Sequence, residues 1–364
     1  MTEKFDIAIV GAGIAGASLA AELAPHAKVV LLEAEERPGY HATGRSAAFW
    51  AETYGGPDVQ PLTSASGPWL AEKGFLGDRG ALTLARARDE ERVESFLAEF
   101  ADKGVRVERL DRSALEAALP GVREDWVSGI AEPDCKDIDV GGLHQWYLGE
   151  AKRAGAEMRC RAALVSATRA GSWSLETADG GRIYCDILAN AAGAWADSVA
   201  EMAGVRPIGI TPMRRTIAQL RVDPRPPENL PLVLDIAGSF YFRPESGRLW
   251  LSPHDETPSP PCDAAPEEID IALAIDRFES AVDWRVERVE HKWAGLRSFA
   301  PDRLPVYGRD PGQPAFFWFA GQGGFGIQTA PAAARLAAQL LLGLLPDDLT
   351  RDLDPELYQA RRFV

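Results

Sequence analysis

The chain has 364 residues, of which 46% are hydrophobic and 26% are charged, and its formal net charge is −15 at pH 7. These proportions are typical of a soluble globular protein, and the length exceeds what one ordinary core organises, so we expect two domains. The negative charge excludes nucleic acid and disfavours an anionic membrane surface as partners, because a polyanion would repel the chain.

Cysteine and histidine residues form no recognisable metal site. The four cysteines, at positions 135, 160, 185 and 262, contain no Cys-x-x-Cys pair, and the five histidines lack ligand spacing. We therefore expect no metal, reduced thiols, and a cytoplasmic protein or one held peripherally at the inner membrane. The apolar stretches 7–23 and 330–345 are interrupted by glycines or polar residues, so we expect no export signal and no integral membrane segment.

Residues 5–33 carry the strongest functional signal. An apolar run, Ile7–Val10, leads into Gly-Ala-Gly-Ile-Ala-Gly at 11–16, a helical pattern follows, and a second apolar run ends in Glu33. This order is the βαβ dinucleotide fingerprint, whose glycines allow a tight turn, a close approach to pyrophosphate and packing of the helix on the strand. Glu33 is spaced to bind ribose hydroxyls, which indicates NAD or FAD rather than NADP and leaves the choice between those two open.

Small and hydroxyl-bearing residues follow directly, over 39–48. Such a segment lets its backbone, Arg45 and Ser46 lie against a pyrophosphate or a flat ring, although a loop with a helix cap explains it equally well.

The middle of the chain alternates helical and strand patterns. Helices are predicted over 59–73, 89–103, from a capping box at Ser113–Glu116 to Pro120, and over 141–154; strands are predicted over 82–84, 163–167, 172–177, 182–184 and 187–191. Asp179-Gly180-Gly181 is a hairpin signal. The last strand leads into the run from Asn190 to Trp195, whose small residues at 191–194 allow close approach to a cofactor or form a tight turn.

The second half of the chain is richer in strands. We predict a β-rich insert over 205–253, a Pro-rich connector over 258–266, helices over 267–282, 326–342 and 355–362, and a strand over 316–319. We expect an interleaved architecture, in which residues 1–50, 139–204 and 295–364 bind a dinucleotide and residues 51–138 and 205–294 form a mixed β-sheet domain that binds substrate.

Two further patches suggest chemistry. Arg297 lies among apolar and aromatic residues in 293–299, where it must find an anion if it is buried; it could instead be a snorkelling surface arginine. Four glycines in 321–329 precede a predicted helix, which would aim its N-terminus at an electron-rich group. A flexible loop is disfavoured there because a strand and a helix flank it.

Together these motifs resemble the D-amino-acid oxidase-like superfamily of FAD flavoproteins, with the nearest likeness to the bacterial D-arginine and D-amino acid dehydrogenases. The likeness is carried by residues 9–18, 38–48, 190–195, 293–299 and 322–329, in the family's order. It implies an α+β two-domain flavoprotein, with a Rossmann-like FAD-binding domain of the GR2 type and an inserted mixed β-sheet substrate domain. It also implies non-covalent FAD, because no cysteine follows Cys262.

The resemblance assigns residues to the cofactor. The ADP half would be bound by Gly11, Gly13, Ile14, Ala15, Gly16 and Glu33, with Val165 beside the adenine. The pyrophosphate and flavin would run along Thr43, Gly44, Arg45, Ser46, Ala47 and Ala48, and the cofactor would also be lined by Ala192, Gly193 and Trp195. The flavin would be contacted by Gly295, Gly324, Phe325, Gly326, Ile327 and Gln328. A helix N-terminus near flavin N1 would stabilise the negative charge of the reduced ring.

The resemblance also implies a substrate site. Arg215 and Arg297 match arginines that bind an amino-acid carboxylate, and Tyr54 and Tyr241 match tyrosines that touch substrate, with Gln328 also assigned to catalysis. The implied reaction converts a D-amino acid to a 2-oxo acid and ammonia by hydride transfer from Cα to flavin N5. Arg214 could face the substrate instead of its neighbour, and the second tyrosine could be a packing residue.

Two departures from the family's pattern bear on specificity. Ala81 stands where the D-arginine enzymes carry a glutamate, and Phe49 stands where they carry a histidine. We therefore expect neutral or hydrophobic D-amino acids, while the nearby Arg86 and Arg88 leave room for an acidic substrate. The same fold would also suit the oxidation of glycine, sarcosine-type amines or a 2-hydroxy acid, or a flavin-binding protein without turnover. The electron acceptor would be oxygen, a quinone or another carrier.

Overall fold

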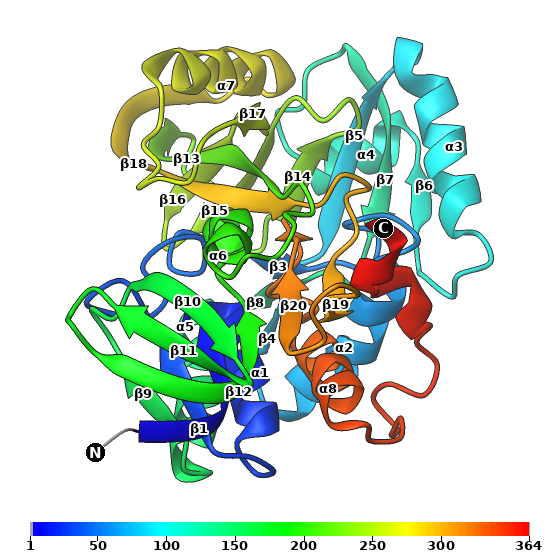
Figure 1. The fold of residues 1–364 in the computed structure, drawn as a ribbon. Helices are drawn as coiled ribbons and strands as arrows, with labels where there is room; N and C mark the ends of the chain where they lie inside the picture. Colours follow the sequence, from blue (N-terminus) through cyan, green and yellow to red (C-terminus); the bar gives the residue numbers. More distant parts are fainter. Residues whose placement is uncertain (1–2, 364) are drawn as a thin grey trace.

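The computed structural model describes residues 3–363. The chain builds two large β-sheets, which form the lower and upper halves of Figure 1, and a three-stranded sheet. The small sheet consists of β3 (Phe49–Trp50), β8 (Lys136–Ile138) and β4 (Leu76–Asp78).

The lower, eight-stranded sheet begins with the N-terminal strand. Its members are β1 (Glu3–Val10), β2 (Val29–Leu32), β9 (Glu157–Arg159), β10 (Leu164–Ala170), β11 (Ser172–Thr177), β12 (Arg182–Asn190), β19 (Val306–Arg309) and β20 (Phe316–Ala320). β1 lies between β2 and β12 and is parallel to both, and β20 is parallel to β12. β2 and β20 are buried along their whole length, as expected of parallel strands covered on both faces.

Helices cover this sheet. α1 (Ile14–Leu23) packs against α5 (Val140–Arg153) and α8 (Ala330–Leu342), and α2 (Gln60–Glu72) packs against α8. α1 and α8 are rich in alanine, so they lie close to the sheet and to each other, and their alanines and leucines share one core with β1 and β20. α6 (Ala196–Met202) follows the end of β12 after the 3₁₀ turn Gly193–Trp195.

The upper, ten-stranded sheet is mixed. Its members are β5 (Ala81–Arg86), β6 (Glu108–Leu110), β7 (Trp126–Glu132), β13 (Thr211–Asp223), β14 (Leu232–Asp235), β15 (Tyr241–Glu245), β16 (Arg248–Ser252), β17 (Thr257–Pro258), β18 (Arg285–Phe299) and β21 (Gln322–Gly323). β13 and β18 form its longest antiparallel pair, whereas β14 and β5 are parallel. α7 (Glu268–Ala281) contacts β13, β16 and β18, while α3 (Glu90–Phe100) and α4 (Arg112–Ala118) lie beside β5 and β7.

The two sheets are joined near the C-terminal third of the chain. β20 belongs to the lower sheet, and directly after it β21 pairs with β18 of the upper sheet, with Gly323 opposite Ser298. β18 also runs through position 295, where the sequence analysis placed a domain boundary. The loop 321–329 therefore connects the two sheets, and any cavity between the sheets would be bordered by this loop.

Several predicted elements differ from the observed ones. The helix predicted from Gly326 begins at Ala330, because residues 324–329 form turns and Pro331 stands in the first turn of the helix, where proline is favoured. The two strands predicted over 182–184 and 187–191 are one strand, and β18 was not predicted as a strand. The cap of α4 is Asp111, whose carboxylate accepts from the Ala114 N–H at 2.8 Å, two residues before the predicted opening at Ser113.

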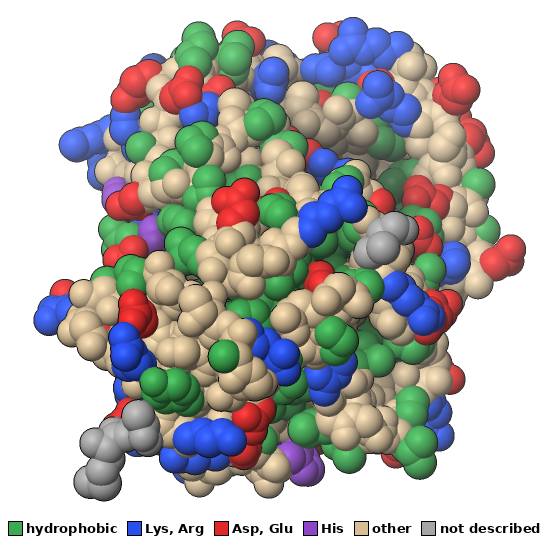
Figure 2. Space-filling model, in the orientation of Figure 1, with side chains coloured by type: hydrophobic (Ala, Val, Ile, Leu, Met, Phe, Trp, Pro, Cys, Tyr) green, Lys and Arg blue, Asp and Glu red, His purple; other side chains and the backbone are tan. Residues whose placement is uncertain are grey.

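The C-terminal segment 355–362, predicted as a short helix, forms two 3₁₀ turns, Pro355–Tyr358 and Ala360–Phe363. A further 3₁₀ turn spans Ala87–Asp89. Between residues 3 and 363, no helix is long and apolar enough to cross a membrane. Figure 2 shows basic and acidic side chains interspersed on one face of the molecule.

Candidate active site and cofactor cavity

A cavity of about 400 Å³ lies where the two sheets meet. It is lined by the carboxyl ends of β1 and β2, at Val10 and Leu32, and by Ala191, just past the end of β12. The opposite wall comes from the upper sheet, with Arg215 on β13 and Leu296 on β18. The carboxyl edge of parallel strands is the usual place for a nucleotide in an open α/β sheet.

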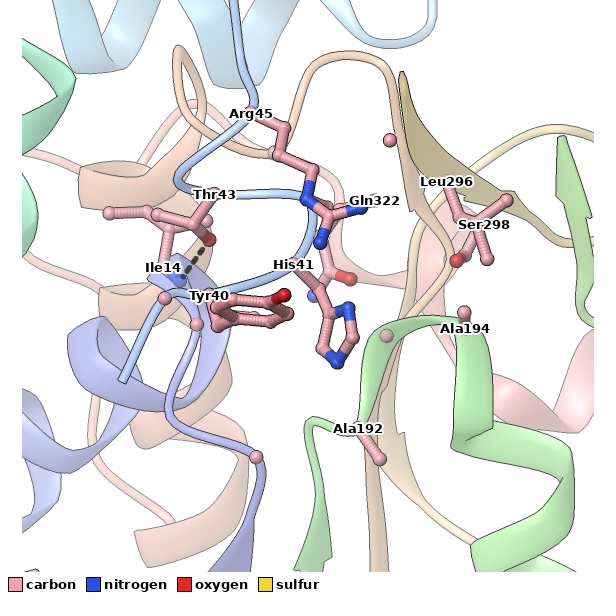
Figure 3. Close-up of a pocket in the computed structure, with 18 of the residues that line it drawn as sticks. Ile14, Tyr40, His41, Thr43, Arg45, Ala192, Ala194, Leu296, Ser298 and Gln322 are labelled. Carbon is pink, nitrogen blue, oxygen red and sulfur yellow. Dashed lines mark hydrogen bonds between the residues drawn. The ribbon is translucent and has the colours of Figure 1, made fainter. Parts of the chain in front are cut away.

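One part of the cavity is shaped by the N-terminus of α1. This helix has no side-chain cap and no acidic residue in its first turn, and Gly13 and Ile14 line the cavity. The Ile14 N–H donates to Thr43 Oγ1 at 2.9 Å, as Figure 3 shows. A Cβ added to Gly16 would lie 1.8 Å from the Gly11 carbonyl oxygen, so only glycine lets the helix approach the turn this closely. The remaining helix-terminal N–H groups form an anion site of the kind that holds pyrophosphate.

Glu33 follows the end of β2 and is buried. Its carboxylate accepts from the Ala12 N–H and from the Glu35 N–H, both at 2.9 Å, and these bonds fix its orientation. An ionised carboxylate has further lone pairs, so both contacts are compatible with ribose hydroxyls as additional donors.

The loop 39–46 is fastened to the connector that precedes α7. Arg45 Nη1 donates to the Ala264 carbonyl at 2.9 Å and to the Ala294 carbonyl at 3.0 Å, and its other terminal nitrogen pairs with Asp263. The Tyr40 hydroxyl donates to Asp263 at 3.1 Å. The Arg45 guanidinium was expected to lie against a pyrophosphate or a flat ring. It lines the cavity (Figure 3), but its terminal nitrogens are bonded to protein oxygens.

The two consecutive arginines of β13 point to opposite faces, as neighbours on a strand must. Arg214 pairs with Glu267 and with Asp270 of α7, at 2.7 Å for the latter. Arg215 lines the cavity with 4% of its side chain exposed; its Nε donates to the Asp255 carbonyl at 2.8 Å and its Nη2 pairs with Glu256 at 3.2 Å. The structure thus selects Arg215 as the arginine that faces the cavity. Burial, together with the charge of Arg297, lowers the pKa of Arg215 from its usual value.

Arg297 comes from β18 and also lines the cavity. Its Nη1 donates to the Tyr54 hydroxyl, and the guanidinium lies 5.7 Å from the centre of that ring. The backbone of Gly324 passes directly over this pair: a Cβ there would lie 2.6 Å from the Tyr54 hydroxyl and 2.8 Å from Arg297 Nη1. The absence of a side chain at Gly324 therefore lets the glycine loop close on the arginine.

Tyr241 begins β15, is buried, and lines the cavity near Arg215, whose guanidinium is 6.0 Å from the ring centre. His254 meets the same ring edge-to-face, with ring centres 5.5 Å apart. Burial and the charges of Arg215 and Arg297 lower the pKa of His254 to about 3, so its imidazole is neutral at physiological pH.

The apolar part of the site lies around Tyr241. Phe49, Ala81 and Ile217 belong to one buried hydrophobic cluster with it, and Ile217 also lines the cavity. Ala81 belongs to this cluster and brings no charge itself, and in the sheet it lies opposite the buried Glu132 of β7.

Most of the predicted site residues are brought together by the fold. Those that line the cavity are Gly11, Gly13, Ile14, Ala15, Glu33, Thr43, Arg45, Ser46, Ala47, Ala192, Gly193, Trp195, Arg215, Tyr241, Gly295, Arg297, Gly324, Gly326 and Ile327. The predicted residues that do not line it are Gly16, Gly44, Ala48, Tyr54, Val165, Phe325 and Gln328. Their predicted contacts with cofactor or substrate stay predictions.

The structure gives the surroundings of two of these residues in detail. Val165 is 53% exposed, and the cavity is lined by the three preceding residues, Ala162 to Leu164. The Gln328 amide is buried and fully used, because its Nε2 donates to the Tyr54 carbonyl at 3.0 Å and to Thr63 Oγ1 at 2.9 Å while its Oε1 accepts from the Ala51 N–H at 3.2 Å. Gln328 ties the Tyr54 loop to the glycine loop rather than facing the cavity.

Sequence reasoning missed several residues of the site. Leu296, Ser298 and Gln322 line the cavity, as do Tyr40 and His41 (Figure 3). Leu296 and Ser298 flank Arg297 on β18, and recognising that strand would have placed them near it. His41 pairs with Glu35 at 2.9 Å and lies 4.6 Å from the Trp195 ring centre, contacts for which the sequence carries no signal.

The described residues contain no cluster of side chains suited to bind a metal ion. No group of three or more His, Cys, Asp or Glu side chains between residues 3 and 363 could hold a metal ion. All four cysteines are free thiols, and Cys262 is the one that lines the cavity.

Comparison with known proteins gives one family and a consistent fold. The sequence profile of the family described as FAD dependent oxidoreductase (DAO) matches residues 6–340. The hydrogen cyanide synthase subunit HcnC of Pseudomonas aeruginosa is 24% identical over 415 aligned positions, which cover 100% of this chain and 97% of that protein. Human mitochondrial dimethylglycine dehydrogenase is 25% identical; the match covers 98% of this chain but only 44% of that longer protein.

Solved structures show the same fold. Glycine oxidase from Geobacillus kaustophilus superposes with a TM-score of 0.84 at 22% identity, covering 98% of both chains. L-proline dehydrogenase from P. horikoshii gives 0.85 at 22% identity, covering 100% of this chain and 98% of that one. Iminodiacetate oxidase from Chelativorans gives 0.79 at 23% identity, covering 97% and 98%. The predicted fold class is confirmed; these likenesses support the superfamily and do not single out the D-arginine dehydrogenases.

Proposed function

This chain belongs to the family of FAD dependent oxidoreductases, and from that premise we propose that it oxidises the C–N bond of small amino acids with uncharged side chains. FAD is the cofactor, and the cavity suits it: the N-terminus of α1 and the carboxylate of Glu33 both line the cavity, which supports their roles in holding the diphosphate and the ribose. When bound, FAD supplies the two-electron acceptor that takes a hydride from the substrate.

The observation that carries the proposal is the pair of guanidinium groups in the cofactor cavity. Arg215 and Arg297 come from adjacent strands of the upper sheet and line the same cavity as the α1 N-terminus. A guanidinium fork binds both oxygens of a carboxylate and so fixes the neighbouring carbon in one orientation. A protein that merely holds a flavin has no need of such a pair.

The substrate class follows from the surroundings of the arginines. Tyr241 and Ile217 line the cavity beside the arginines and belong to one apolar cluster with Phe49 and Ala81, so a substrate side chain would meet apolar surface there, and the two guanidinium groups would repel a cationic one. We infer that neutral D-amino acids are oxidised to 2-oxo acids and ammonia. The electron acceptor that regenerates FAD is proposed to be oxygen, a quinone or another carrier.

N-substituted glycines are an equally good second candidate. The family likeness extends to proteins named for dimethylglycine, glycine and iminodiacetate, and all these compounds present a carboxylate next to an amine. The same arginine pair would hold the carboxylate of glycine or of an N-substituted glycine with one carboxylate, and only the substituent on nitrogen or carbon would differ.

A single experiment separates these candidates. The purified holoenzyme is mixed anaerobically with D- and L-alanine, glycine, N-methylglycine, proline, D-lysine and D-lactate, and the visible flavin absorbance is followed. We expect bleaching by D-alanine or by N-methylglycine and much slower bleaching by D-lysine. Bleaching by D-lactate alone would assign a hydroxy acid instead. A flavin that no compound reduces would refute amine oxidation and favour a binding protein. Readmitting oxygen or a quinone then identifies the acceptor.

A further inference from the structure

A third charged group stands beside the two arginines. Glu256 Oε1 lies 3.2 Å from Arg215 Nη2, and the same carboxylate accepts from Arg303 Nη2 at 3.0 and 2.8 Å. The Glu256 side chain is 34% exposed and that of Arg303 is 52% exposed, whereas Arg215 is buried. Glu256 therefore links the buried arginine of the cavity to an arginine at the surface.

The hydrogen bonds of Arg215 leave one nitrogen for a ligand. Its Nε is bonded to the Asp255 carbonyl and its Nη2 to Glu256, but Nη1 is buried without a partner in the described part of the chain. A buried cationic donor without an acceptor is costly, so this nitrogen is suited to one carboxylate oxygen of a ligand that also contacts Arg297.

Glu256 limits how a ligand can use Arg215. Arg303 offsets the charge of Glu256 from the surface side, but the Glu256 carboxylate still occupies Nη2 of Arg215. A first ligand carboxylate would take Nη1 of Arg215 together with Arg297. A second carboxylate would have to compete with Glu256 for Arg215 and would be repelled by it in a partly buried, weakly screened site.

We propose that Glu256 is a specificity-determining residue that admits monocarboxylate substrates and rejects dicarboxylates. This proposal rests on the proposed function, because it concerns the same carboxylate site. It goes beyond it by assigning a discriminating role to a residue that need not touch the substrate. A purely supporting role, in which Glu256 only orients Arg215, would affect all carboxylates alike.

The test measures binding rather than turnover. Acetate and malonate are titrated separately into the oxidised holoenzyme, and the perturbation of the flavin spectrum gives the dissociation constant of each. We expect the wild-type protein to bind acetate more tightly than malonate. In Glu256→Gln the ratio of malonate affinity to acetate affinity should rise by about tenfold or more. An unchanged ratio overturns the proposal, even if both affinities fall.

Two matched variants separate charge from volume and from position. Glu256→Asp keeps the charge and should keep the wild-type ranking. Glu267→Gln removes the same charge from the ion pair of the neighbouring Arg214, on the other face of β13, and should leave the ratio unchanged. A rise in the ratio in either control contradicts the assignment to the Glu256 charge.

A surface variant keeps the proposal testable if Glu256→Gln fails to retain FAD. Arg303→Glu places an extra negative charge beside Glu256 at an exposed position and should weaken malonate more than acetate, by several-fold. Equal weakening of both ligands contradicts the proposal.

The outcome is distinguishable from failure of the proposed function. If no amine reduces the flavin but the malonate-to-acetate affinity ratio still shifts in Glu256→Gln, the discriminating role of Glu256 is supported and amine oxidation is refuted. If D-alanine reduces the flavin but the affinity ratio does not shift, amine oxidation is supported and the discriminating role of Glu256 is refuted. For an active enzyme, D-aspartate against D-alanine gives the same comparison in rate constants of flavin reduction.

Discussion

At the scale of single residues, strand alternation decides the chemistry of this site. Arg214 and Arg215 are neighbours of identical type, and the sequence left open which of them faces the substrate. The register of β13 against β18 places Arg215 opposite Gly295, inside the cavity, and directs Arg214 toward α7. Such a choice depends on long-range strand pairing and on which face of the sheet is covered, neither of which local sequence reports.

The arginine that carries the carboxylate contact can be tested directly. Arg297→Ala should raise the substrate dissociation constant about a hundredfold or more, because a charge-assisted contact inside the cavity is lost, while FAD stays bound. Stopped-flow measurement of flavin reduction against substrate concentration gives the constant. Arg214→Ala serves as the control and should leave it unchanged. Normal turnover by Arg297→Ala would show that the carboxylate binds elsewhere.

His254 makes the stability of the protein depend on acidity. Its folded-state pKa of about 3 is far below the ordinary value of 6.5, so the unfolded chain binds a proton more readily than the folded one. The stabilisation is complete above pH 6.5 and is lost as the pH falls toward 3. We expect the unfolding free energy of the wild type to fall more steeply over this range than that of His254→Gln, measured by urea denaturation. The exposed His26→Gln variant should follow the wild type, and identical slopes for all three would contradict the prediction.

At the scale of elements, the sequence pattern predicted correctly those helices and strands that short-range interactions determine. The β1–α1–β2 unit was predicted because its glycines, its apolar runs and Glu33 all fall at fixed spacing within one short segment. β18 was missed because its first half alternates poorly: it is largely exposed there and buried only toward Phe299. The start of α8 was misplaced because glycines do not mark where a helix begins, whereas Pro331 does.

The glycine loop offers a test at this scale. In Gly324→Ala the new methyl group would collide with the Tyr54 hydroxyl and Arg297 Nη1, so the loop or the arginine must shift. We expect kcat/KM to fall about a hundredfold, since small misplacements of positioning groups have effects of that size, with FAD content unchanged. Gly141→Ala, where the nearest atom to the added Cβ is 3.8 Å away, provides a matched control for the same substitution. Full activity of Gly324→Ala would show that the arginine tolerates displacement.

At the scale of the whole molecule, the cofactor cavity is shared by both large sheets. Val10 and Leu32 come from the lower sheet, and Arg215 and Leu296 from the upper one, so a ligand in the cavity contacts both. The candidate site was largely predictable because the family motifs mark the loops that wall it. The connections between distant segments, such as Arg45 with Asp263, could not be predicted, because their sequences carry no mutual signal.

Binding at such a junction stabilises the folded chain as a whole. We expect FAD to raise the midpoint of thermal unfolding, because a ligand present at a hundred times its dissociation constant adds about 2.7 kcal/mol. Calorimetry of apoprotein with increasing FAD would show a midpoint that climbs with concentration. AMP, which can contact only the ribose and adenine side, should give a smaller rise. A midpoint of thermal unfolding that does not change with FAD concentration would contradict the expectation that FAD bound in the cavity stabilises the folded chain.

The contacts of Arg45 with the connector join two segments that are made at different times during synthesis of the chain. The connector contributes Cys262 and Ala264 to the cavity wall and holds the loop 39–46 through Asp263 and Ala264, yet it is synthesised more than two hundred residues after that loop. The cofactor cavity is therefore complete only after the connector has been synthesised and has packed against the loop.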